Sequence, residues 1–312
     1  MTHLTFVHGI ANKPPHDVLL EQWRNALSDN GGLNLPRMGV TSEMVYWADM
    51  FHAAPARTRA GLESLGAADG SVSPTAADAD WIDEIDAEEA AFVRRLAIRL
   101  GVDLTLPPDP PVPPDPSDES DSTPELLPPA TARNLMRVLL HEVYHYLFDA
   151  EFSPRTGETF RIRRDIRARV LDVLRIGADQ RGPHILVGHS LGSVIAYDVL
   201  TADLDAPPVD GLLTLGSPLG LTEVQHCLKP VWTRHAGWPT ARLGTNRWCN
   251  VSDALDPVCG GPPAWKIAGD FMDAGQERVL DLPATNEGLW RHSAVKYLRQ
   301  QVLRNELRAM LR

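Results

Sequence analysis

With 312 residues, of which 43% are hydrophobic, the chain can bury a sizeable core, and its length favours one α/β domain over residues 1–312 rather than two small ones. Its formal net charge of −11 excludes nucleic acid as the main partner, because a phosphate backbone is bound by clustered lysine and arginine. No apolar run could span a bilayer and no signal-peptide pattern is present, so we expect a cytoplasmic protein without a transmembrane segment.

The N-terminal segment predicts two neighbouring strands and a helix. Residues 3–7 form a short apolar strand that leads directly into a loop beginning at His8. Apolar residues at helical spacing predict a helix over residues 17–27. A second strand, rich in β-favouring residues, follows over residues 41–47, and we expect it to lie beside the first.

Residues 49–150 form an insertion, a candidate cap or lid, in which the periodic pattern weakens. One helix is predicted over residues 81–100, acidic in its first turns and basic at its end, as the helix dipole favours. Residues 107–129 are rich in proline and aspartate and almost free of apolar side chains, so they cannot bury enough surface to order themselves. We expect a disordered loop there; a proline-rich ligand for another protein is the alternative.

The next predicted helix, over residues 131–150, contains the run HEVYH, which matches the zinc-protease signature H-E-x-x-H. On a helix, His141 and His145 would share a face and could ligate zinc, with Glu142 as general base. A third ligand is required, yet the sequence shows neither the extended downstream histidine pattern nor a glutamate in a second apolar helix. The sequence therefore favours a helix that packs in the core or lid, with no metal or other cofactor, over a zinc peptidase.

A further helix is predicted over residues 159–176, where isoleucine, valine and leucine recur at helical spacing and arginines occupy the opposite face. We expect this helix to come directly before the next strand in the chain and to pack there. A solvated face is the favoured interpretation of the arginines, and transient contact with anionic lipid headgroups at a membrane surface is the alternative.

The stretch over residues 184–200, HILVGHSLGSVIAYDVL, contains the strongest functional signal in the chain. Its order of apolar run, glycine-flanked serine and apolar helix predicts a strand, a sharp turn and a helix. The turn GHSLG fits the G-x-S-x-G nucleophile elbow, whose glycines permit a strained backbone that exposes the serine oxygen at the sheet edge. Ser190 is therefore the predicted nucleophile, and an ordinary helix N-cap serine is the alternative.

Three more strands and a last helix are predicted over residues 209–215, 247–251, 277–282 and 293–311. A serine nucleophile needs a histidine base and a carboxylate that holds the tautomer of that base, in the chain order serine, acid, histidine. His292 is the only histidine after residue 250. Asp256 is the favoured acid because it precedes Pro257 and should lie in extended backbone, whereas Asp253 is placed to cap the turn.

Acyl transfer also needs N–H donors for the oxyanion that develops on the substrate. One donor comes from the residue after the nucleophile, here Leu191, and another from a loop after an early strand. Gly9 and Ile10 occupy that loop, and we expect them to form this part of the oxyanion hole. A simple glycine-containing turn is the alternative.

Together the runs FVHGI, VGHSLGSVIAYDVL, LLTLGSPLG and NVSDALDPV resemble the catalytic core of α/β-hydrolase serine lipases and esterases, and GHSLGSVIAYDVL followed by GSPLG is similar to intracellular phospholipase A1-type enzymes. The resemblance implies the α/β-hydrolase fold, a mostly parallel sheet of about six strands flanked by helices. It also implies Ser190, Asp256 and His292 as the catalytic triad, with the N–H groups of Leu191 and Ile10 as the oxyanion hole.

We therefore predict a serine hydrolase that cleaves carboxylic esters, with a small-molecule ester or a lipid as its substrate. A thioesterase or amidase with the same triad is the alternative among enzymes, since the triad does not determine the leaving group. Outside enzymes, the alternative is a non-catalytic binding or scaffold protein built on the hydrolase fold.

Overall fold

The computed structural model describes residues 1–56, 80–106, 129–230, 232–288 and 290–312. Its centre is a six-stranded parallel sheet with the strand order β2-β1-β5-β6-β7-β8. The strands are β1 (His3–Val7), β2 (Thr41–Val45), β5 (His184–His189), β6 (Gly211–Leu215), β7 (Arg247–Asp253) and β8 (Val279–Ala284). The structure thus confirms the predicted α/β architecture.

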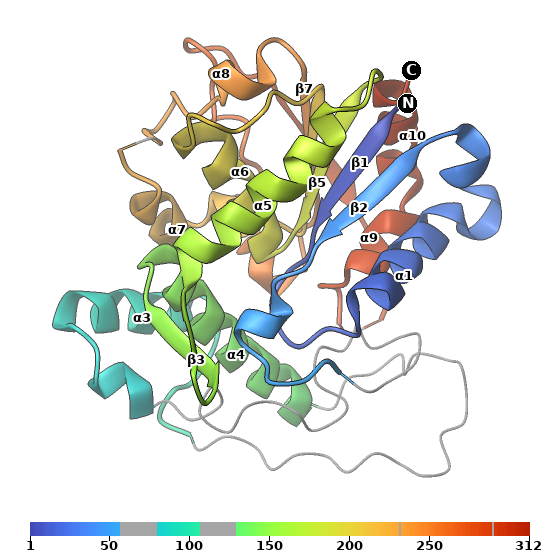
Figure 1. The fold of residues 1–312 in the computed structure, drawn as a ribbon. Coiled ribbons are helices and arrows are strands. Elements are labelled where there is room, and N and C mark those ends of the chain that lie inside the picture. The colour runs from blue at the N-terminus through green and yellow to red at the C-terminus, as the bar shows by residue number, and fades with distance from the viewer. Residues whose placement is uncertain (57–79, 107–128, 231, 289) are drawn as a thin grey trace.

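Helices cover both faces of this sheet, as a parallel sheet requires (Figure 1). One face is covered by α5 (Ile162–Ala178) and α6 (Leu191–Ala202), and the other by α1 (His16–Ser28), α9 (Ala294–Arg299) and α10 (Gln301–Met310). Each face has its own apolar core. Because they are covered on both sides, the central strands β1, β5 and β6 are buried along their whole length, which explains their continuous apolar runs.

The strand register brings the loops that follow four strands to one edge of the sheet. Val7 at the end of β1 pairs with Gly188 of β5, and His189 pairs with Leu215, which in turn pairs with Val251 of β7. In open parallel sheets, this carboxyl edge is where ligands bind. The loops after β1, β5, β6 and β7 therefore meet where a site is expected.

The insertion lies beyond this same edge (Figure 1). Its described elements are η5 (Asp80–Asp83), α3 (Ala87–Arg99), α4 (Pro129–Leu147) and a hairpin of β3 (Glu151–Arg155) with β4 (Glu158–Arg161). Of the loop predicted to be disordered, residues 107–128 lie outside the described part of the chain.

The shorter elements elsewhere in the described chain are η1 (Asp29–Gly31), η2 (Pro36–Met38), η3 (Ala48–Met50), η6 (Pro218–Gly220), α7 (Thr222–Cys227), α8 (Thr240–Leu243) and η7 (Pro257–Cys259).

Three predicted element boundaries were wrong. The helix expected over residues 81–100 is a 3-10 turn followed by α3, because the Asp86 side chain accepts a hydrogen bond from the Glu88 N–H and starts a new helix there. The last helix is likewise divided at Gln300, whose ψ of 129° is extended rather than helical. The β3–β4 hairpin was missed, and α5 begins after it, at Ile162 rather than at residue 159.

The arginine face of α5 is solvated at Arg164 and Arg175, as predicted, but other arginines of the helix are paired with carboxylates of other elements. Arg163 contacts the fully buried Asp198 of α6 at 2.5 Å, and the Tyr146 hydroxyl of α4 donates to the same carboxylate. Arg169 contacts Asp49 at 2.5 Å. A buried carboxylate requires such partners, so the contacts of Asp198 tie α4, α5 and α6 together.

No helix among the described residues is long and apolar enough to cross a membrane.

Stability should depend on pH through His184, which is 2% exposed and whose Nε2 lies 2.9 Å from Thr5 Oγ1. Burial, aided by the neighbouring His3, lowers the pKa of His184 from 6.5 to about 4. Between these values the unfolded chain binds a proton that the folded chain does not, so stability falls as pH drops from about 6.5 to about 4. This one group should contribute a loss of about 3 kcal/mol.

Urea unfolding of the wild type and of His184→Gln at several pH values measures this contribution. Glutamine retains a polar partner for Thr5 but does not titrate. The stability that the variant loses on acidification should therefore be about 3 kcal/mol smaller than the loss in the wild type. Equal losses in the two proteins would contradict the assignment.

Candidate active site

Ser190 lies in the sharp turn between β5 and α6, with φ of 55° and ψ of −131°. This conformation is strained for any residue other than glycine, and such strain is typical of functional sites. The turn also requires its two glycines. A Cβ on Gly188 would come within 2.6 Å of the Gly192 oxygen, and one on Gly192 would lie 2.3 Å from the Val7 oxygen.

The Ser190 side chain does not act as a helix cap, because it accepts no hydrogen bond from the first turn of α6. Ser190 thus stands at the N-cap position of α6 without capping the helix through its side chain. Its hydroxyl is buried, and within the described ranges it has no hydrogen-bond partner. A buried hydroxyl without a partner is costly, which indicates a role other than packing.

Asp256 and His292 come together across the loops after β7 and β8. Asp256 Oδ2 lies 2.8 Å from His292 Nδ1, and both side chains are buried. The carboxylate also accepts hydrogen bonds from the Val258 N–H at 2.9 Å and from the Tyr297 hydroxyl at 2.8 Å. With an ionised carboxylate as partner, His292 donates from Nδ1, which leaves Nε2 as the atom that can accept a proton.

Asp253 has a different set of partners and does not contact His292. Its carboxylate accepts hydrogen bonds from the Leu255 N–H at 2.9 Å, the Asn286 N–H at 2.7 Å and the Arg291 guanidinium at 2.9 Å. The first contact caps the turn, as the sequence predicted. The other two hold the segment that leads to His292, so Asp253 supports that segment without contacting the imidazole.

The elbow and the Asp256–His292 pair are neighbours. The ring of His189, the residue before the nucleophile, stacks on the His292 ring with centroids 4.7 Å apart. A Cβ on Gly216, directly after β6, would come within 3.2 Å of both Asp256 Oδ2 and His292 Nδ1. His292 Nε2 is buried and, like the serine oxygen, has no hydrogen-bond partner in the described part of the chain.

Three residues that shape the site were not predicted: His189, Gly216 and Tyr297. Burial lowers the pKa of His189 well below its usual range, and the neighbouring His292 lowers it further, so His189 stacks as a neutral ring. Burial and the nearby Asp256 carboxylate raise the pKa of Tyr297 well above its usual range, so its hydroxyl stays protonated and donates. Gly216 was visible as the turn after a strand, whereas Tyr297 resembles any buried residue of an amphipathic helix.

The loop after β1 lies against the nucleophile. A Cβ on Gly9 would come within 2.6 Å of Ser190 Cβ, so only glycine permits this approach. Ile10 follows directly, and Leu191 is the first residue of α6, where N–H groups have no partner within the helix. The structure thus places Gly9 against Ser190, while Ile10 follows Gly9 and Leu191 follows Ser190 in the chain.

The H-E-x-x-H run lies on α4 as predicted, but its side chains have other partners. The His145 and His141 rings lie 4.2 Å apart, and His145 Nδ1 bonds to the His141 carbonyl at 2.8 Å. Glu142 contacts the Ala11 N–H and His52. The part of the chain that the structure describes contains no group of three or more His, Cys, Asp or Glu side chains that could hold a metal ion.

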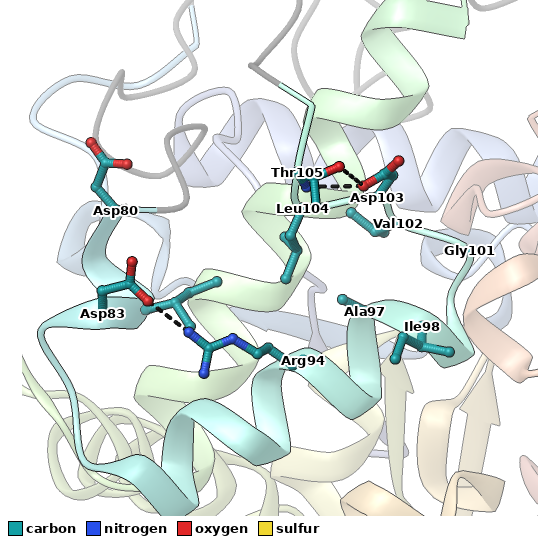
Figure 2. Close-up of a pocket in the computed structure, with 11 residues that line it drawn as sticks. Asp80, Asp83, Arg94, Ala97, Ile98, Gly101, Val102, Asp103, Leu104 and Thr105 are labelled. Carbon is teal, nitrogen blue, oxygen red and sulfur yellow. Dashed lines mark hydrogen bonds and ion pairs between the residues drawn. The ribbon is translucent and has the colours of Figure 1, made fainter.

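A separate pocket of about 670 Å³ lies within the insertion (Figure 2). Its walls come from η5, α3 and the turn that follows, and Arg94 of α3 reaches across to Asp83 at 2.6 Å. All of its lining residues fall between 80 and 105. It therefore shares no residue with the elbow or with the Asp256–His292 pair.

Fold and site together define an α/β protein with a serine elbow beside a histidine–aspartate pair. No protein-family model and no curated protein matches the sequence. The chain is similar in structure to TT1662 from Thermus thermophilus, with 12% identity and a TM-score of 0.43 over 99% of this chain and 89% of that one. It is also similar to an uncharacterized protein from Pseudomonas aeruginosa, with 10% identity and a TM-score of 0.34 over 99% of this chain and 46% of that one. At these identities and scores, neither likeness bears on the chemistry of the site.

Proposed function

We propose that this protein is a serine hydrolase of the α/β-hydrolase type that cleaves carboxylic esters through an acyl-enzyme on Ser190. The observation that carries the proposal is the buried hydrogen bond of 2.8 Å between Asp256 and His292 beside a strained elbow serine. The carboxylate holds the imidazole in the tautomer whose Nε2 can take a proton, which a serine hydroxyl needs in order to act as a nucleophile.

In the first half of the reaction, Ser190 Oγ attacks the ester carbonyl carbon and its proton passes to His292 Nε2. The carbonyl oxygen becomes an oxyanion, stabilised by the N–H groups of Leu191 and Ile10. Asp256 stabilises the imidazolium without taking its proton. The tetrahedral intermediate then expels the alcohol, which receives the proton from His292, and an acyl-serine remains.

In the second half, a water molecule attacks the acyl carbon and gives its proton to His292 Nε2. The intermediate collapses, Ser190 Oγ leaves and recovers its proton from the imidazolium, and the carboxylic acid is released. The substrate is a small-molecule ester or a lipid, and the protein's own residues supply every proton transfer.

An active-site fluorophosphonate probe tests the proposal. Its phosphorus reacts with an activated serine, so one probe should attach per chain, and mass spectrometry of the digested protein should locate it on the peptide that contains Ser190. A folded protein that does not react, or that carries the probe elsewhere, would contradict the proposed function.

A further inference from the structure

The glutamate of the H-E-x-x-H run has no part in the triad, yet it is one of the most buried charged residues of the protein. Glu142 is 1% exposed. One carboxylate oxygen accepts a hydrogen bond from the Ala11 N–H at 3.0 Å, and the other lies 3.2 Å from His52 Nε2. A carboxylate buried in this way is costly unless its partners are held in place, so these two contacts define its environment.

The contact to Ala11 fixes one side of Ile10. Ala11 has a φ of 71°, in the left-handed region that an alanine rarely adopts, so its conformation needs external support. The Ala11 N–H belongs to the same peptide unit as the Ile10 carbonyl, and Lys13 Nζ donates to that carbonyl at 2.5 Å. Glu142 and Lys13 thus hold the two ends of one peptide plane.

A hydrogen bond from His8 to the Gly9 carbonyl fixes the other side of Ile10. His8 Nδ1 lies 2.7 Å from the Gly9 carbonyl, and His8 Nε2 accepts the Trp47 N–H at 3.0 Å. Burial, together with the charge of Lys13, lowers the pKa of His8 well below its usual range, so the neutral ring donates from Nδ1. The Gly9 carbonyl and the Ile10 N–H share one peptide unit, so this bond orients the N–H as well.

From this geometry we infer that Glu142 is a positioning residue of the oxyanion hole, an inference that rests on the proposed function. The carboxylate comes from the insertion and contacts the first residue beyond Ile10. Because the Ile10 N–H lies in the preceding peptide unit, Glu142 acts on it by fixing the Ile10–Ala11 plane, while His8 fixes the Gly9 carbonyl on the other side. Because such donors must be aligned in advance, loss of this support should lower kcat strongly and change the affinity for substrate little.

Glu142→Ala, Glu142→Gln and the matched control Glu89→Ala test the inference. Glu89 accepts a hydrogen bond from the Tyr144 hydroxyl at 2.7 Å, so it supports the same helix α4 without contacting the loop after β1. The variants are compared in hydrolysis of p-nitrophenyl butyrate, in thermal unfolding, and in inhibition by a trifluoromethyl ketone, whose serine adduct bears an oxyanion.

We expect Glu142→Ala to lower kcat by about 10- to 100-fold with little change in KM, and to raise the inhibition constant of the ketone by a similar factor. Glu142→Gln keeps an oxygen that can accept the Ala11 N–H and should recover most of the kcat. Glu89→Ala should lower the unfolding temperature but leave kcat near that of the wild type. If Glu142→Ala does not fold, Glu142→Asp is expected to show the same loss, because the shorter side chain cannot reach both partners.

Equal kcat losses in the Glu142 and Glu89 variants, or unchanged kcat in Glu142→Ala or its aspartate substitute, would overturn the positioning role. In either case, fluorophosphonate labelling of Ser190 would still support the proposed function. A wild type that neither reacts with the probe nor cleaves the ester would overturn both.

Discussion

Ser190→Ala should lower kcat for hydrolysis of p-nitrophenyl butyrate by about 10⁶-fold, to the residual rate that binding and the oxyanion hole sustain without a nucleophile. The same variant should no longer react with a fluorophosphonate. The physical reason is that alanine removes the attacking oxygen while His292 and Asp256 remain in place. Stability should change little, because the Ser190 hydroxyl has no hydrogen-bond partner among the described residues.

Ser217→Ala is the matched control for this experiment. Ser217 is also buried and also follows a central strand, but its hydroxyl accepts hydrogen bonds from Ser193 Oγ at 2.7 Å and the Leu219 N–H at 3.2 Å. The variant should cost about 1 kcal/mol of stability and keep both activity and labelling. Labelling that persists in Ser190→Ala, or that disappears in Ser217→Ala, would rule out Ser190 as the nucleophile.

Asp256→Asn should lower kcat by about 10⁴-fold. An asparagine amide can donate to His292 Nδ1, which would place the imidazole proton on Nε2 and prevent it from accepting the serine proton. The asparagine oxygen then takes the place of Oδ1 and still accepts the Val258 N–H, so the variant should fold, whereas the Tyr297 hydroxyl, which donates to Oδ2, loses its acceptor. Steady-state kinetics on the same ester, with circular dichroism to check folding, measures the effect.

Asp253→Asn separates this effect from general damage to the loop after β7. Its carboxylate contacts the Asn286 N–H and Arg291, so its loss should destabilise the protein by about 1–3 kcal/mol. Because Asp253 does not contact His292, the kcat of the Asp253→Asn variant should fall by about tenfold at most, through looser placement of the imidazole. Similar kcat losses in the two variants would leave Asp256 without a special role.

Local patterns in the sequence predicted most of the sheet. The central strands are buried on both faces, so their continuous apolar runs are visible without any knowledge of their neighbours. Errors occurred at helix boundaries that the apolar pattern does not mark. Asp86 starts α3 through its own hydrogen bond to Glu88, and Gln300 divides the last helix, although the apolar stripe continues across both positions.

The candidate site was predicted only in part, because only some of its residues are marked by local motifs or chain order. The elbow is a local motif, and chain order together with the single late histidine indicated His292. The choice between Asp256 and Asp253 depended on turn chemistry, and the structure places the first against His292 and the second against Arg291. Tyr297 donates to Asp256 from 41 residues away, and no local pattern marks such a contact.

The sequence by itself thus determined the α/β sheet and the elbow, because burial and turn geometry are encoded in adjacent residues. Only the tertiary structure decided the partners of the buried polar groups. Glu142 is the clearest case: its local motif predicted a helix packed in the core or lid, and it accepts a hydrogen bond from the Ala11 N–H, 131 residues earlier in the chain. A buried carboxylate takes the donors that the fold brings within reach, and those donors come from distant segments that no local spacing describes.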